Sequence, residues 1–279
     1  MQKNYNKYFP VFVLPTLLAF LVMFVVPFLI GLFLSFTKFT VVNNWEWVGI
    51  SNYLDAFRFD SGFANALWFT VKFTVVSVLT INVFAFLLAM ALTRGLKGSN
   101  LFRTVFFMPN LIGGIVLGYI WNLIINGILG YRGLDITYSA NYGFWGLVVL
   151  MNWQLIGYMM VIYIAGLQNV PGELLEAGAI DGASPFQRLR YIILPVLSPS
   201  ITICTFLTLT NSFKLFDQNL ALTAGAPANE TSMLALDIYQ TFYGRIGWQG
   251  VGQAKAVLFF LIVALISFVQ LRATSGKEG

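Results

Sequence analysis

Apolar residues fall into six long runs along the chain, and polar connections separate them. Several of these runs exceed the roughly 18 residues that a helix needs to cross a bilayer. We therefore predict an all-α polytopic membrane protein with six transmembrane helices. They are expected at Phe9–Phe36, Leu67–Thr93, Phe106–Ile125, Phe144–Leu167, Pro195–Phe213 and Val251–Leu271.

The order of these runs predicts a simple domain organisation. Residues 1–66 would hold the first helix and an outer loop, 67–272 a core of five helices, and 273–279 a cytoplasmic tail. Lys3 and Lys7 before the first run resemble the start of a signal peptide. That run is far longer than the roughly 7–15 residues of a signal core, so we interpret it as a retained helix.

The positions of lysine and arginine predict the orientation. Short cytoplasmic loops are enriched in these residues. With the N-terminus in the cytoplasm, the following all lie inside: Lys3, Lys7, Arg94, Lys97, Arg103, Arg188, Arg190, Arg272 and Lys277. The opposite orientation would translocate the dense cluster from Arg94 to Arg103. We therefore expect both termini, and the connection between Leu167 and Pro195, to be cytoplasmic.

Composition supports a membrane protein and excludes several chemistries. The chain is 58% hydrophobic and 10% charged, with a mean hydropathy of +0.78, against about 25% charged residues in soluble domains. It has no histidine and a single cysteine, Cys204, within an apolar run. No histidine-dependent nucleophile or His-rich metal site can be built, and we expect no catalytic residue and no metal site. The net charge of +5 is explained by basic cytoplasmic loops, so no nucleic-acid partner is expected.

One cytoplasmic connection, residues 169–195, has the pattern of two short capped helices. Glu173–Ile180 is expected to be the first, with Pro171 suited to its first turn and Gly182 able to take positive φ where it stops. Ser184-Pro185-Phe186-Gln187 predicts a second start, with a serine N-cap and a capping box to glutamine. So structured a cytoplasmic connection favours a docking element for another protein.

The stretch from Glu176 to Pro195, E-A-G-A-I-D-G-A-S-P-F-Q-R-L-R-Y-I-I-L-P, resembles the EAA loop of binding-protein-dependent ABC importer permeases. Residues 101–110 are similar to the family's opening of the third span, and residues 222–227 to its T-x-G-G-P outer segment. Among these permeases the chain is most similar to the sugar importers of the maltose type. It departs from the pattern at Gly178 and Leu189 and lacks the large periplasmic insertion of the longer maltose permease subunit.

This resemblance implies a type-I ABC importer permease fold in a bacterial or archaeal cytoplasmic membrane. The loop would dock on an ATPase through Glu176, Ala177, Asp181, Gly182, Ala183 and Pro195. The implied partners are two ATP-binding subunits, a second related permease and an extracytoplasmic sugar-binding protein. ATP and magnesium would bind only the ATPase, because this chain has no G-x-x-x-x-G-K-[ST] motif. A homodimer, and a periplasmic or a lipid-anchored binding protein, remain open.

Polar residues in the fourth and fifth runs are the candidate carbohydrate contacts. Such residues are costly within a span unless they face a cavity or another helix. The candidates are Asn152, Gln154, Tyr158, Thr208, Asn211 and Ser212. The resemblance implies a sugar site between these two spans, and Tyr158, Thr208, Asn211 and Ser212 lie near the matching positions. Amides and hydroxyls suit sugar hydroxyls, although hydrogen bonds between helices explain the same residues.

Three lysines and two glycines carry further expectations. Lys72, Lys214 and Lys255 lie near outer span ends, where we favour snorkelling to the interface over a basic mouth for an anionic substrate. Lys214 is three residues before Asp217, a spacing that suits a local ion pair. Gly114 and Gly118 are expected to pack helices.

The alternative function is a self-contained secondary transporter or channel, which the near absence of acids from the predicted spans disfavours.

Overall fold

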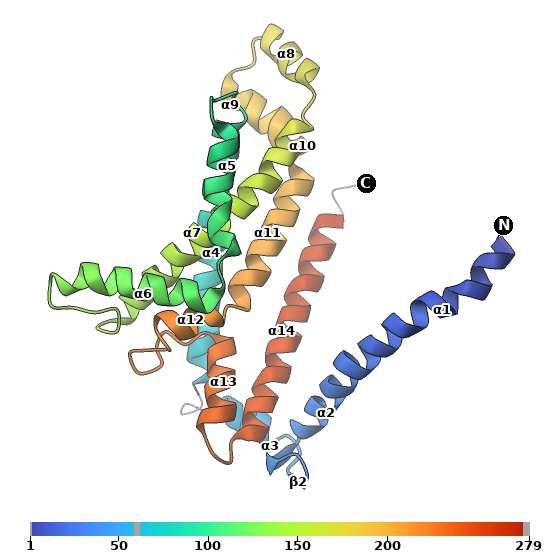
Figure 1. Cartoon of the computed structure of the whole chain (residues 1–279), viewed down its shortest axis with the longest axis vertical. Helices are drawn as coiled ribbons and strands as arrows, with labels where there is room; N and C mark the ends of the chain where they lie inside the picture. Colours follow the sequence, from blue (N-terminus) through green and yellow to red (C-terminus); the bar gives the residue numbers. More distant parts are fainter. Residues whose placement is uncertain (1, 59–61, 276–279) are drawn as a thin grey trace. The chain divides into compact units, whose positions relative to one another are not determined.

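A computed structural model describes residues 2–58 and 62–275 and is helical apart from connections and one β-hairpin (Figure 1). The described residues form two compact units. Unit 1 falls within Met1–Ala64 and Asp237–Ile262, and unit 2 within Asn65–Leu236 and Val263–Gly279. Three helices, α4, α13 and α14, run from one unit into the other.

Unit 1 contains the first predicted span and the hairpin that follows it. Its elements are α1 (Gln2–Phe20), the π-helical turn η1 (Leu21–Val25), α2 (Val26–Leu34), β1 (Thr37–Val41), β2 (Asn44–Trp47) and α3 (Ser51–Ala56), with most of α13 (Leu234–Gly244) and the first half of α14 (Gln249–Ser275). The strands pair antiparallel, with Thr37 opposite Trp47. The buried Asn52 amide donates to the carbonyls of Ser35 at 2.9 Å and Thr37 at 2.8 Å, which joins α3 to the start of the hairpin.

Unit 2 contains the helices around the predicted second to fifth spans. They are α4 (Phe63–Leu92), α5 (Ser99–Phe107), the 3₁₀ turn η3 (Met108–Leu111), α6 (Gly114–Gly130), α7 (Ala140–Gln168), α8 (Gly172–Ile180), α9 (Pro185–Arg188), the π-helical turn η4 (Leu189–Ile193), α10 (Leu194–Val196), α11 (Ser198–Phe213) and α12 (Asp217–Leu222).

Four helices are long and apolar enough to cross a membrane, within the part of the chain the structure describes. They are Val11–Leu34, Phe63–Leu92, Ala140–Gln168 and Gln249–Gln270. Two bent pairs bring the number to the predicted six if each counts as one span: Ser99–Leu111 with Gly114–Gly130, at 102°, and Pro185–Val196 with Ser198–Phe213, at 72°.

The third and fifth spans are therefore not the single helices that the apolar runs predict. Ile112 and Gly113 have extended backbone angles, which separate η3 from α6 and let the chain change direction. The fifth span breaks next to Pro199, in the first turn of α11. Proline has no N–H and its ring clashes with the carbonyl four residues earlier, so a continuous helix cannot pass through it undisturbed.

Helix α7 is the centre of unit 2 and has buried residues along its whole length. Gly157 lets α5 cross it closely, because a Cβ on Gly157 would collide with the Phe106 backbone. A polar seam joins α7 to its other neighbours. Tyr163 Oη donates to Asn82 Oδ1 at 2.8 Å, and Asn82 Nδ2 donates to Thr208 Oγ1 at 3.3 Å. These bonds connect α4, α7 and α11 deep inside the unit.

The short helix α12 packs on α6 through the two glycines expected at a helix contact. A Cβ on Gly114 would lie 2.7 Å from Asp217 Cβ, and one on Gly118 would lie 2.7 Å from Ala221 Cβ. Asn122 Nδ2 on α6 also donates to the Leu222 carbonyl at 2.6 Å. The expectation that these glycines pack helices is confirmed, since only hydrogen side chains permit this approach.

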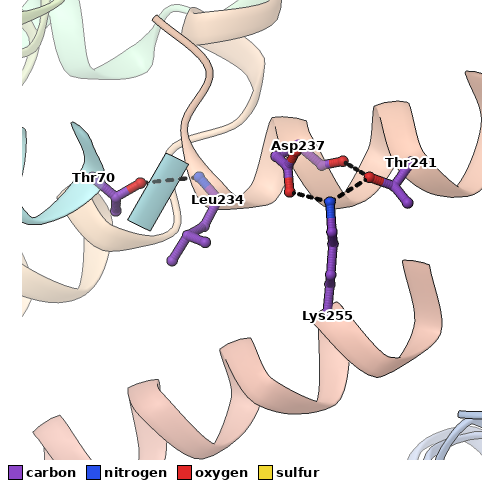
Figure 2. Close-up of polar contacts among 5 residues, drawn as sticks. All are labelled: Thr70, Leu234, Asp237, Thr241 and Lys255. Carbon is purple, nitrogen blue, oxygen red and sulfur yellow. Dashed lines mark hydrogen bonds and ion pairs between the residues drawn. The ribbon is translucent and has the colours of Figure 1, made fainter. Parts of the chain in front are cut away.

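A buried amide organises the turn after α12. Asn219 Nδ2 donates to the Thr231 carbonyl at 2.8 Å and to Thr223 Oγ1 at 3.0 Å, and its Oδ1 accepts from the Met233 amide at 2.9 Å. Thr70 Oγ1 on α4 then accepts from the Leu234 amide at 2.9 Å (Figure 2). These bonds fix segment 222–234, because the buried amide of Asn219 and the Leu234 N–H find partners.

Candidate functional site

The segment 169–195 forms two capped helices, as its sequence predicts. Ser184 Oγ accepts from the Gln187 amide at 3.3 Å, and Gln187 Oε1 accepts from the Ser184 amide at 2.7 Å. This reciprocal pair is a complete capping box, and Pro185 follows as the first helical residue of α9. Pro171 is the N-cap of α8, one position before the first turn in which it was expected.

Helix α8 ends in a Schellman motif around Gly182. The Ala183 amide donates to the Gly178 carbonyl at 2.9 Å, and the Gly182 amide donates to the Ala179 carbonyl at 3.1 Å. Gly182 has a φ of +78°, which glycine adopts without the steric cost that a Cβ brings. Two opposed caps therefore fix the corner between α8 and α9.

The six predicted docking residues lie together on this corner and on α10. Glu176, Ala177, Asp181, Gly182 and Pro195 are exposed, and Ala183 is half-buried. Large apolar side chains beside them are also uncovered: Ile180 is 87% exposed and Phe186 69%. Within unit 2, α8 and α9 lie at the end of α7 and α11 that is remote from α12 (Figure 1). The surface suits a protein partner, and its docking role stays a prediction.

Gly178, one of the departures from the resembling pattern, has a local packing role. A Cβ there would lie 2.9 Å from Ile192 Cδ1. The glycine lets α8 approach η4 closely, and α8 remains helical through Ile180.

A cavity of about 390 Å³ opens in unit 2 at the other end of α11. Its wall comes from η3, α7, the end of α11 and the start of α12. The lining residues are Asn110, Met151, Gln154, Leu155, Tyr158, Asn211, Lys214, Leu215, Phe216, Asp217 and Gln218. Its size is in the range of small-molecule sites, and its wall carries more polar groups than apolar ones.

Three of the six predicted substrate residues line this cavity: Gln154, Tyr158 and Asn211. Gln154 Oε1 accepts from Gln218 Nε2 at 2.8 Å, which joins α7 to α12 across the wall. The Tyr158 ring contacts Phe107 edge-on, with ring centroids 6.2 Å apart. Gln154 and Tyr158 on α7, Asn211 on α11 and Gln218 on α12 therefore meet only in the folded chain.

The other three predicted substrate residues do not line the cavity. Asn152 donates to Thr80 Oγ1 on α4 at 2.9 Å. Thr208 is fully buried and donates to the Cys204 carbonyl at 2.7 Å. Ser212 is also fully buried. Asn152 and Thr208 thus make contacts within and between helices, the second of the two interpretations that the sequence left open.

Four polar wall residues were outside the predicted site: Asn110, Lys214, Asp217 and Gln218. The Lys214–Asp217 spacing was visible in the sequence, but no ion pair joins the two side chains among the described residues. Gln218 could not be predicted as a wall residue, because nothing in the sequence indicates that α12 turns back against α7.

The expectation for Lys255 is wrong. Its side chain is fully buried and does not reach an aqueous interface. Within unit 1 the ammonium lies 2.8 Å from Asp237 Oδ2 and 2.8 Å from Thr241 Oγ1 (Figure 2). Lys72 does extend outward, with its ammonium 5.7 Å from the Trp68 ring centre. Hydropathy could not distinguish these lysines, because Asp237 is eighteen residues from Lys255 and meets it only in the fold.

Comparison with known proteins identifies the family. Residues 81–274 match the model of the binding-protein-dependent transport system inner membrane component. The chain is 45% identical to the probable starch degradation products transport system permease protein AmyD of Thermoanaerobacterium thermosulfurigenes, over 96% of this chain and 94% of that protein. It is 31% identical to the multiple sugar-binding transport system permease protein MsmF of Streptococcus mutans, over 100% and 99%.

The fold agrees with this assignment. A bacterial ABC transporter involved in the import of the acidic polysaccharide alginate superposes with a TM-score of 0.81 over 98% of both chains, at 18% identity. At that identity the likeness concerns the fold alone. The family model's match at residues 81–274 includes both the capped segment and the cavity. This chain therefore belongs to the family of binding-protein-dependent transport system inner membrane components.

Proposed function

We propose that this chain is the permease subunit of an ATP-driven importer that carries a carbohydrate delivered by an extracytoplasmic binding protein. Its coupling segment, residues 169–195, docks on a separate ATPase subunit. Its cavity in unit 2 holds the sugar during passage. The names of AmyD and MsmF support a carbohydrate, and starch-derived oligosaccharides are our first choice, since AmyD shares 45% of its residues with this chain.

The observation that carries this proposal is the construction of the corner between α8 and α9. A Schellman motif and a capping box hold two short helices at a fixed angle, while the side chains that they present are exposed. Each cap contributes about 1 kcal/mol. A surface so well fixed and so open suits the transmission of a partner's movement, because its two ends connect to α7 and, through α10, to α11.

The assembly we propose has two permeases and two ATP-binding subunits, with both termini of this chain in the cytoplasm. ATP and magnesium bind the ATPase subunits. The second permease is a related chain, by the resemblance to the maltose type. The secondary-transporter alternative loses its support, because the family works with binding proteins.

The test is copurification of the importer in mild detergent with measurement of ATPase activity. Gly182→Arg places a large charged side chain on the docking corner and should remove the ATPase subunit. Gly133→Arg is the matched control, because Gly133 has a φ of +68° against +78° at Gly182 and both have open space around them. Both variants therefore carry the same kind of backbone strain.

Loss of the ATPase with Gly182→Arg but not with Gly133→Arg supports the proposal. Equal loss from both variants would indicate backbone strain instead of docking. A wild-type chain that purifies alone and transports sugar in vesicles without ATP would overturn the proposal and return the secondary transporter as the explanation.

A further inference from the structure

The cavity wall in unit 2 carries one positive and one negative side chain. Lys214 follows α11, and Asp217 begins α12. The two are three residues apart, yet they form no ion pair within the described part of the chain. Both side chains are therefore available to a ligand, and their formal charges cancel over the wall as a whole.

The other polar groups of the wall are neutral. They are the amides of Asn110, Gln154, Asn211 and Gln218 and the hydroxyl of Tyr158. Amides and hydroxyls can each donate and accept hydrogen bonds, as sugar hydroxyls do. Two of these groups already have donors engaged: Gln218 Nε2 bonds Gln154, and Asn211 Nδ2 bonds the Leu207 carbonyl at 2.8 Å. The Asn110 amide, the Tyr158 hydroxyl, the Asn211 carbonyl oxygen and the two charged groups are left to meet a ligand.

We propose that Lys214 and Asp217 together set the charge selectivity of this cavity and restrict it to uncharged, hydroxyl-rich ligands. The inference rests on the proposed function and adds to it the two residues that select the charge of the substrate. A lysine alone would favour an anionic sugar. Asp217, on the same wall, repels a carboxylate or phosphate that Lys214 attracts, so an anion gains little, whereas a neutral sugar can donate to one group and accept from the other.

The cavity strengthens this discrimination. Charges interact more strongly in a partly enclosed site than in bulk water, because the effective dielectric constant is lower. Rejection by a repulsive group is an established way to obtain selectivity. Asp217 is the repulsive element here, and it is the residue whose loss should convert a neutral site into one that accepts anions.

The experiment measures equilibrium binding to the purified importer complex without its binding protein, since the binding protein would impose its own selectivity. The probes are maltotriose and its C1-oxidised aldonic acid, two ligands of nearly equal size that differ in charge. Wild type should bind maltotriose more tightly. Asp217→Asn should shift the ratio of the two affinities toward the acid on the order of tenfold.

Three further variants make the result specific. Lys214→Gln should shift the ratio away from the acid, and the double variant Lys214→Gln/Asp217→Asn should return it close to the wild-type value. Glu230→Gln removes one exposed carboxylate that does not line the cavity and should leave the ratio unchanged.

The outcomes separate the inference from the function beneath it. If wild type binds maltotriose and Asp217→Asn leaves the ratio unchanged, or if wild type prefers the acid, the charge inference is wrong and the proposed function stands. If wild type binds neither probe, nor other neutral oligosaccharides, the sugar-binding role of the cavity fails and the inference fails with it.

Discussion

Lys255 Nζ lies 2.8 Å from Asp237 Oδ2, and this ion pair joins α14 to α13 inside unit 1 (Figure 2). Lys255 is fully buried and Asp237 is 8% exposed. Thr241 Oγ1 accepts a second bond from the ammonium and donates to the Asp237 carbonyl at 2.7 Å. A buried charge of this kind persists only when its partners replace the water that it has lost.

Breaking this pair from one side should be costly. We expect Lys255→Met to lower the free energy of unfolding by about 3–5 kcal/mol, because it leaves the Asp237 carboxylate buried without its counter-ion. Lys255→Met/Asp237→Leu should recover most of that loss. Thermal unfolding of wild type, both single variants and the double variant measures the coupling, and strictly additive losses would contradict it.

The stability of Lys255→Met, relative to that of wild type, should depend on pH. Burial raises the pKa of Asp237, and the Lys255 ammonium opposes that rise. In Lys255→Met the pKa of Asp237 rises further above its usual value near 3.9. A group whose pKa is raised by folding contributes stability below its unfolded pKa and loses it as the pH rises through the folded pKa. The variant should therefore lose stability relative to wild type as the pH increases, and a difference that is constant with pH would refute this.

A substitution at Gly157 tests how closely α5 and α7 must approach each other where they cross. Gly157→Ala should destabilise unit 2 by about 1–3 kcal/mol, since overpacking forces the backbone at Phe106 to move. Gly127→Ala is the matched control: Gly127 is an exposed glycine inside α6 with open space around it, and alanine there should be neutral or slightly stabilising. Equal unfolding temperatures for the two variants would show that the crossing tolerates a methyl group.

A substitution of Asn219 tests what holds the segment after α12 in place. Asn219→Leu keeps a similar volume but strands the Met233 amide and the Thr231 carbonyl. We expect a loss of about 1–3 kcal/mol for each stranded group, with faster proteolysis of the segment. Asn100→Leu, at an exposed position of α5, serves as the control. An unfolding temperature equal to that of Asn100→Leu would mean that water replaces the amide.

Ser184 tests whether the fixed corner matters for coupling. Ser184→Ala removes the acceptor of the Gln187 amide and should weaken the start of α9 by about 1 kcal/mol. Under the proposed function, transport-linked ATPase activity of the assembled importer should fall, and Ser184→Asp, which keeps an acceptor, should restore it. Full activity in Ser184→Ala would show that partner contacts alone hold the corner.

The two capped helices of residues 169–195 could be predicted from the sequence, because their caps depend on local interactions. A capping box and a glycine at positive φ depend on residues within a few positions of each other, so Ser184, Gln187 and Gly182 specify the corner almost alone. The long apolar runs likewise predicted the spans, because crossing a bilayer requires length and apolarity before any tertiary contact. The breaks in two spans were missed because hydropathy does not register a change of direction at Gly113 or Pro199.

The sequence by itself determined a membrane protein, the positions of its long apolar segments and the capped corner between α8 and α9. The tertiary structure decided which polar side chains share a space. Gln154, Asn211 and Gln218 line one cavity because α12 packs back on the glycines of α6, whereas Thr208 bonds between helices. It also decided that Lys255 is buried with Asp237 and does not extend to an interface. The physical reason is that a polar side chain's role depends on its neighbours across helices, and spacing along one helix does not contain that information.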